Sequence, residues 1–183
     1  MDLFEIINGK AFPTVHALMI EPFKTIWEKD TTNEKGHAIK VFTYIELCCS
    51  PKKSNPFLGY SEEKRPEQVK KEVYGDPDKK DTEFMVLGVL KYKELLAKSS
   101  PTYPLLIAGL NAKDELVSYL ETFDLGERTQ GGTAVIKPAD ITKALKEIPD
   151  VARSINSMID KVHAELVEEA KTRNQREVGQ YER

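Results

Sequence analysis

Cysteine is nearly absent from this sequence: only two of the 183 residues are cysteine, and Cys48 and Cys49 are neighbours. Adjacent cysteines cannot build the spaced disulfide framework of a small secreted domain, and they lack the two-residue gap of a zinc or redox motif. The three histidines are scattered along the chain, which argues against a four-ligand metal set. We therefore expect no metal and no cofactor, and we expect both cysteines to pack in the core as small apolar side chains.

Long apolar runs and an excess of basic residues are also missing. No stretch of about 18 apolar residues is present, so the sequence predicts no membrane segment. The formal net charge of −3 gives no general attraction to nucleic acid, which argues against a dedicated DNA-binding domain. The first residues lack the basic and apolar pattern of a secretory signal, so we expect the chain to be made and assembled in a cytoplasm.

Recognisable catalytic signatures are absent as well. The sequence contains neither the G-x-S-x-G elbow of serine hydrolases nor a glycine-rich phosphate loop, and we interpret the Gly131-Gly132 pair as a flexible connection. Acidic and basic residues are neighbours at 28–30 and at 62–65, and such mixed charges are typical of solvated faces with weak ion pairs. These observations predict a protein that is not an enzyme.

What the sequence does contain is helical periodicity over most of its length. Apolar residues recur at spacings of three and four, which predicts a mainly α-helical protein with a single helical-bundle domain over residues 1–170. Residues 1–19 form an N-terminal extension that is either irregular or a small β-hairpin around Asn8-Gly9. A glycine-containing loop is expected at 126–137, and an extended, charged C-terminal arm at 171–183.

The periodicity also assigns faces and boundaries to individual helices. The helix that follows the N-cap candidates Thr31, Thr32 and Asn33 is expected to bury one stripe of side chains. That stripe comprises Ala38, Val41, Phe42, Ile45, Cys48 and Cys49. A polar helix is expected to begin at Ser61, and the segment 82–99 is expected to be the central buried helix. Residues 103–123 predict either a short apolar helix followed by an amphipathic one, or one long, bent helix. Pro149 is expected to separate a short helix from the longest one.

Two segments are candidates for contact with a partner. The loop that follows Pro51 carries Phe57, Leu58 and Tyr60 among turn-forming residues, so these side chains either form a contact surface or fold back over the helix ends. The C-terminal arm carries Arg173, Arg176 and Tyr181. It is either solvated, or it becomes ordered against a neighbouring subunit by means of its guanidinium donors and its aromatic ring.

The run from Ile20 to Arg65 resembles a pattern in virion proteins of tailed bacteriophages, including crAss-like phages. The matching positions are Trp27, Asp30, Lys35, Ala38, Tyr44, Ile45, Asn55, Pro56, Tyr60, Glu62, Glu63 and Arg65. The resemblance implies a structural protein of the neck, or head-to-tail connector, where rings of identical subunits join the portal to the tail. It also implies location in the virion, contacts with portal and tail proteins, and DNA at most as passing cargo.

A ring subunit needs two different faces, because each copy contacts the next through a heterologous interface. We therefore expect the 51–60 loop and the 171–183 arm to lie against neighbouring chains, and deletion of the arm to block assembly without changing helical content. The alternative is a soluble helical binding or adaptor protein that has no catalytic activity and forms only small assemblies.

Overall fold

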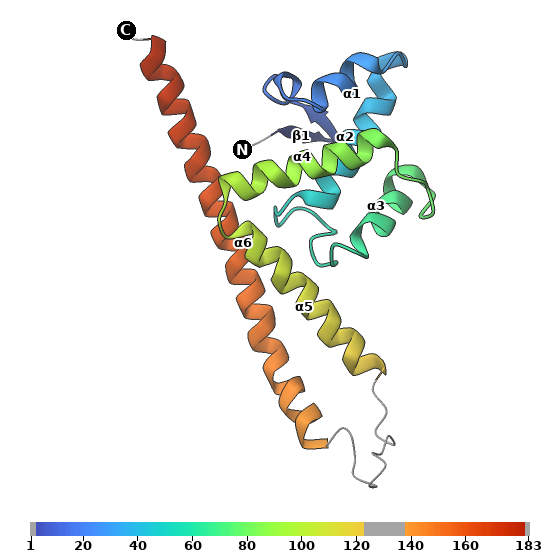
Figure 1. Ribbon diagram of the computed structural model, residues 1–183, viewed down its shortest axis with the longest axis vertical. Coiled ribbons are helices and arrows are strands. Elements are labelled where there is room, and N and C mark those ends of the chain that lie inside the picture. The colour runs from blue at the N-terminus through green and yellow to red at the C-terminus, as the bar shows by residue number, and fades with distance from the viewer. Residues whose placement is uncertain (1–2, 123–137, 182–183) are drawn as a thin grey trace.

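The computed structural model describes residues 3–122 and 138–181, and it is mainly α-helical, as the sequence predicts (Figure 1). The described elements are β1 (Phe4–Ile7), β2 (Lys10–Pro13), α1 (Phe23–Lys29), α2 (Gly36–Cys49), α3 (Arg65–Tyr74), α4 (Glu83–Ser99), α5 (Tyr103–Thr122) and α6 (Pro138–Tyr181). Single 3-10 turns at Ala17–Met19 and Asn33–Lys35 precede α1 and α2. The predicted loop at 126–137 lies outside the described residues.

The two strands form the β-hairpin that the Asn-Gly pair predicts. Asn8 and Gly9 have positive φ angles of 52° and 74°, as a two-residue turn between antiparallel strands requires. The amide of Ala11 points away from β1 and donates to Thr43 Oγ1 on α2 at 2.9 Å. The hairpin therefore lies directly on α2 and covers one side of it.

The centre of the N-terminal body is α2, which packs against β2, α3 and α4. All six residues of the predicted apolar stripe, from Ala38 to Cys49, are buried. The expectation that 82–99 forms the central helix is wrong, because α4 exposes Val86, Leu87 and Leu90. Only one stripe of α4 faces the core, and Gly88 on that stripe lets α4 approach Ile45 of α2 closely.

The N-terminus of α2 is held by an aspartate that the sequence places on a solvated face. Asp30 is buried and accepts hydrogen bonds from the Ala38 amide at 2.7 Å and from both the amide and the hydroxyl of Thr32. Burial alone would raise the pKa of Asp30, but these hydrogen bonds outweigh burial and lower the pKa to about 2. The N-cap candidate Thr32 also contributes, because its Oγ1 accepts from the His37 amide at 3.3 Å.

The last two helices form an antiparallel hairpin beside the N-terminal body (Figure 1). Residues 103–122 are one helix, which is the second of the two alternatives, and α6 runs through Pro149 as a single helix of 44 residues, contrary to the expected break. Pro149 removes one backbone hydrogen bond on the exposed side of the helix, where water can solvate the freed carbonyl. The backbone is helical to Tyr181, so the segment from residue 171 continues α6 and is not the extended arm expected from sequence.

Candidate functional site

The most unusual side chain in the structure is Arg65, at the first residue of α3. It is only 2% exposed, although the charge pattern at 62–65 predicts a solvated face. Its guanidinium donates to the carbonyl oxygens of Cys48 at 2.9 Å, Leu58 at 3.1 Å and Tyr60 at 2.8 and 3.2 Å. Arg65 therefore joins the C-terminal turn of α2, where carbonyls lack helical partners, to the loop that follows.

The buried side chain of Asn55 also forms hydrogen bonds that fix the conformation of this loop. Its amide nitrogen donates to the carbonyls of Leu47 and Ser50, both at 2.9 Å, and its amide oxygen accepts from the Phe57 amide at 3.0 Å. These bonds turn the chain back over the end of α2. The segment 51–60 thus has a defined conformation that its turn-forming composition does not reveal.

Because the loop folds back, the three predicted contact residues differ in how exposed they are. Leu58 is buried, which agrees with the alternative that the loop folds back, and its contact with a partner stays a prediction. Phe57 is partly buried, and Tyr60 is 42% exposed, with the two ring centroids 6.3 Å apart. Tyr60 is therefore the most exposed of the three predicted contact residues. The side chains of Arg173, Arg176 and Tyr181 lie outside the described residues.

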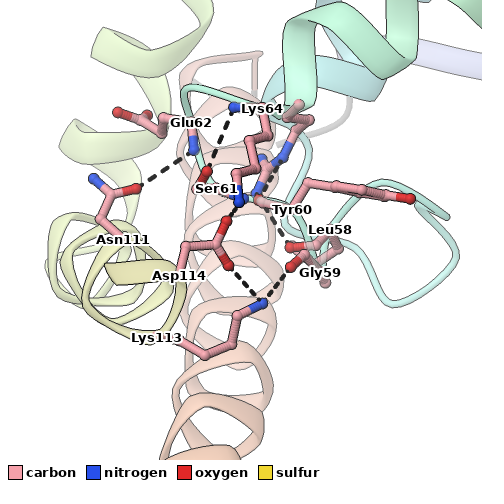
Figure 2. A network of polar contacts seen from close by, with 10 residues as sticks. Leu58, Gly59, Tyr60, Ser61, Glu62, Lys64, Asn111, Lys113 and Asp114 are labelled. Carbon is pink, nitrogen blue, oxygen red and sulfur yellow. Dashed lines mark hydrogen bonds and ion pairs between the residues drawn. The ribbon is translucent and has the colours of Figure 1, made fainter. Parts of the chain in front are cut away.

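Polar contacts join the end of this loop to α5 (Figure 2). The Ser61 amide donates to Asp114 at 3.2 Å, the Glu62 amide donates to Asn111 at 3.4 Å, and Lys113 donates to the Gly59 carbonyl at 2.5 Å. Burial alone would raise the pKa of Asp114, but its bonds to Ser61 and Lys113 outweigh burial and lower the pKa. The loop and α5 are therefore joined along several consecutive residues.

This network also explains why α3 begins later than the sequence predicts. Ser61 is buried, and its Oγ accepts from the Lys64 amide at 3.4 Å, so Ser61 stabilises a turn that precedes the helix. The helix then begins at Arg65, with Pro66 in its first turn, where the missing N–H has little cost.

A shallow groove of about 670 Å³ runs between this loop, α5 and α6. Its floor is apolar, and two lysines and an asparagine supply the polar rim. The lining residues include Leu58, Leu110, Ile155 and Ile159, with Lys53, Lys113 and Asn156 at the rim. Lys53 forms an ion pair with Asp160 at 2.6 Å, and Lys113 forms one with Asp114 at 3.1 Å. Both lysines of the groove are therefore already paired with carboxylates of the same chain.

The cysteines pack as the sequence predicts. Both are buried and unpaired, and burial raises the pKa of Cys48 to about 12 and that of Cys49 well above its ordinary value. Both thiols therefore stay protonated at neutral pH, which makes them poor nucleophiles and poor metal ligands. Within residues 3–122 and 138–181, no cluster of histidine, cysteine, aspartate and glutamate is suited to a metal ion.

Glu165 attaches α6 to the turn between α4 and α5. Its carboxylate accepts from the Ser100 hydroxyl and the Thr102 hydroxyl, both at 2.6 Å, and from the Thr102 amide at 3.2 Å. Burial alone would raise the pKa of Glu165, but these hydrogen bonds outweigh it and lower the pKa. The bonds fix the middle of α6 against the N-terminus of α5.

The opposite end of the α5–α6 hairpin has apolar side chains that are partly or largely exposed. No described side chain within 111–122 or 139–154 is buried, and the exposed fractions of Val117 and Leu145 are 40% and 54%. We call these two stretches the distal hairpin. The apolar positions 116, 117, 119 and 120 exceed what one stripe needs, which is the sequence signal for a second contact face.

None of the helices in the described part of the chain combines the length and the apolar content needed to cross a membrane. Comparison with models of known protein families, with curated proteins and with solved structures found no match. The functional argument therefore rests on the residues and on their arrangement.

Proposed function

We propose that the protein is a non-catalytic structural subunit of a bacteriophage virion, and that it forms a homo-oligomeric ring in the neck, between the portal and the tail. The resemblance of residues 20–65 to phage virion proteins suggests this setting. The arrangement of α6 supports the more general part of the proposal, which is a subunit that assembles with other chains.

The observation that carries this proposal is the length of α6 compared with the part of the helix that packs against the rest of the chain. A helix of 44 residues is about 66 Å long. Among its described side chains, the buried ones all lie between Ile155 and Leu166. Both ends of α6 extend beyond the N-terminal body, one past α4 and the other alongside α5 (Figure 1). Helical stability in proteins comes mostly from packing, so such ends favour contacts with other chains.

The candidate site supplies a second place for a neighbour to bind. Tyr60 is exposed at the edge of a loop that Arg65 and Asn55 hold in one conformation. An aromatic side chain on a preorganised loop loses little conformational freedom on binding, which suits a subunit contact. In this proposal, Tyr60 contacts the next copy in the ring.

The test is the mass of the purified protein, measured by light scattering alone and after co-expression with the portal protein of the same genome. We expect a closed ring of many copies, and we expect Tyr60→Ala to weaken it. Lys64→Ala is the matched control, because Lys64 is also exposed near the loop but lacks an aromatic ring. A monomer or dimer under both conditions would refute the ring and favour the soluble adaptor.

A further inference from the structure

A separate cavity of about 490 Å³ lies where the β-hairpin, the turn at Asn33–Lys35, α2 and α3 meet. Its volume falls within the range of about 300–1,000 Å³ that is usual for ligand pockets. The apolar part of its lining consists of Phe12, Ile39, Leu47 and Val73, all of them buried or partly buried. The cavity therefore has an apolar floor built from three different elements.

Hydrogen bonds hold the walls of this cavity in position. Ile39, Thr43 and Leu47 follow one another at intervals of four residues, so they share one face of α2. The Thr43 hydroxyl accepts from the Ala11 amide at 2.9 Å and donates to the Ile39 carbonyl at 2.7 Å. These bonds fix the hairpin against α2, so the cavity is formed before a ligand arrives, and binding costs less ordering.

The backbone at one edge of the cavity is unusual. Glu34 and Lys35 have φ angles of 54° and 57°, in the left-handed region that residues with a Cβ seldom adopt. The Lys35 ammonium donates to the Asp30 carbonyl at 2.7 Å, and Asp30 itself caps α2, so both ends of this turn are held. In this conformation Glu34 lines the cavity. Backbone strain that the surrounding structure maintains is concentrated at ligand-binding sites.

The charges of the lining indicate the chemistry of a ligand. Four charged side chains line the cavity, two of each sign: Lys10, Glu34, Lys40 and Glu72. All four are exposed, and none forms an ion pair within the part of the chain that the structure describes. A ligand with charge of one sign only would face two like charges, whereas a ligand with both signs meets an opposite charge for each of its own. The apolar floor requires an apolar group between them.

We propose that this cavity binds a peptide segment in which one apolar side chain lies between a basic and an acidic residue. The apolar side chain occupies the floor, the acidic residue pairs with Lys10 or Lys40, and the basic residue pairs with Glu34 or Glu72. Three consecutive residues of a peptide supply all three groups. The site is separate from the Tyr60 loop, so the proposal goes beyond the proposed function and does not depend on the ring.

The test is a titration of the isotope-labelled full chain with blocked tripeptides, followed in two-dimensional amide NMR spectra. Each peptide has a central leucine, flanked by lysine and glutamate in either order, by two lysines, or by two glutamates. We expect at least one mixed-charge peptide to shift the amide signals of Ile39, Thr43 and Val73 saturably. It should bind about ten times more tightly than either same-charge peptide, because each of those gives up one ion pair and faces like charges.

Reversing two charges makes the test specific to this cavity. In the double variant Lys10→Glu and Lys40→Glu, all four charged side chains of the lining are acidic, so the peptide with two lysines should become the tightest ligand. The matched control, Lys80→Glu with Lys146→Glu, makes the same change of charge at exposed lysines that do not line the cavity, and it should keep the wild-type preference.

Circular dichroism verifies that both double variants keep the wild-type helical content. Three results would overturn the proposal: no saturable shift of the cavity amides in the wild-type protein, equal binding of all four peptides, or an unchanged preference in the charge-reversal variant. The comparison of peptides on the wild-type protein decides the matter by itself if the charge-reversal variant does not fold.

Discussion

Replacing Arg65 with methionine should destabilise the protein far more than a change at an ordinary charged position. The guanidinium is 2% exposed and donates four hydrogen bonds to the carbonyls of Cys48, Leu58 and Tyr60. Methionine fills a similar apolar volume but donates no hydrogen bond. The substitution therefore leaves the end of α2 and the loop after it without their common partner.

The expected loss in the free energy of unfolding is the balance of opposing contributions. A hydrogen bond to a charged group contributes about 1.5–3 kcal/mol, and a buried carbonyl left without a partner costs about 1–3 kcal/mol. Release of the buried charge from its desolvation cost offsets part of this loss. We expect Arg65→Met to lower the free energy of unfolding by about 3 kcal/mol, against a typical total of about 5–15 kcal/mol. Arg65→Lys should cost about 2 kcal/mol, because an ammonium group cannot reach all three carbonyls at once.

Urea denaturation followed by circular dichroism measures this effect. A loss of about 3 kcal/mol should lower the midpoint by about 1–2 M urea. Lys64→Met is the matched control, since Lys64 is the preceding residue and is exposed, and its midpoint should stay close to that of the wild type. If Arg65→Met unfolds within about 1 kcal/mol of the Lys64→Met control, the guanidinium does not hold the loop and the reasoning is wrong.

Three further predictions concern the helices. Asp30→Ala should cost about 1–2 kcal/mol near neutral pH. Since the pKa of Asp30 in the folded protein, about 2, lies below the ordinary 3.8, this stabilisation is present above about pH 4 and is lost as the pH falls towards 2. Urea denaturation should therefore show wild type and variant converging at acid pH. Gly88→Ala should lower the free energy of unfolding by about 1–3 kcal/mol, because the added Cβ would overlap Ile45. Gly109→Ala should be nearly neutral, because the closest atom to its added Cβ is the flexible end of the Met158 side chain. Equal shifts in the thermal midpoint of the two variants would contradict this prediction. Deletion of 171–183 should prevent ring assembly on native gels while the urea midpoint stays unchanged, and it should reduce the helical signal only by the turns removed.

The parts of the fold that depend on short-range patterns could be predicted from the sequence. The Asn8-Gly9 turn specifies the hairpin, because both residues tolerate positive φ angles. The spacing of apolar residues in α2 identifies its buried stripe, including both cysteines. Each of these features depends on residues that are close together in the chain. The prediction of a mainly α-helical protein is correct for the same reason.

The loop and Arg65 could not be predicted, because their partners lie far apart in sequence. Arg65 donates to the Cys48 carbonyl at the end of α2, 17 residues earlier in the chain. The Ser61 amide donates to Asp114, 53 residues later. A run of two acidic and two basic residues gives no sign that one cation will be buried among carbonyls. The sequence also left open whether Leu58 is exposed or buried, because its burial depends on the loop conformation that the hydrogen bonds of Asn55 hold.

The described attachment of α6 to the rest of the chain lies near the middle of the helix. Glu165 bonds to Ser100 and Thr102, and the buried side chains from Ile155 to Leu166 surround that point. This attachment therefore sets the direction in which the C-terminal end of α6 leaves the body. In the proposed ring, the same attachment in every copy would point the C-terminal ends of all α6 helices in equivalent directions.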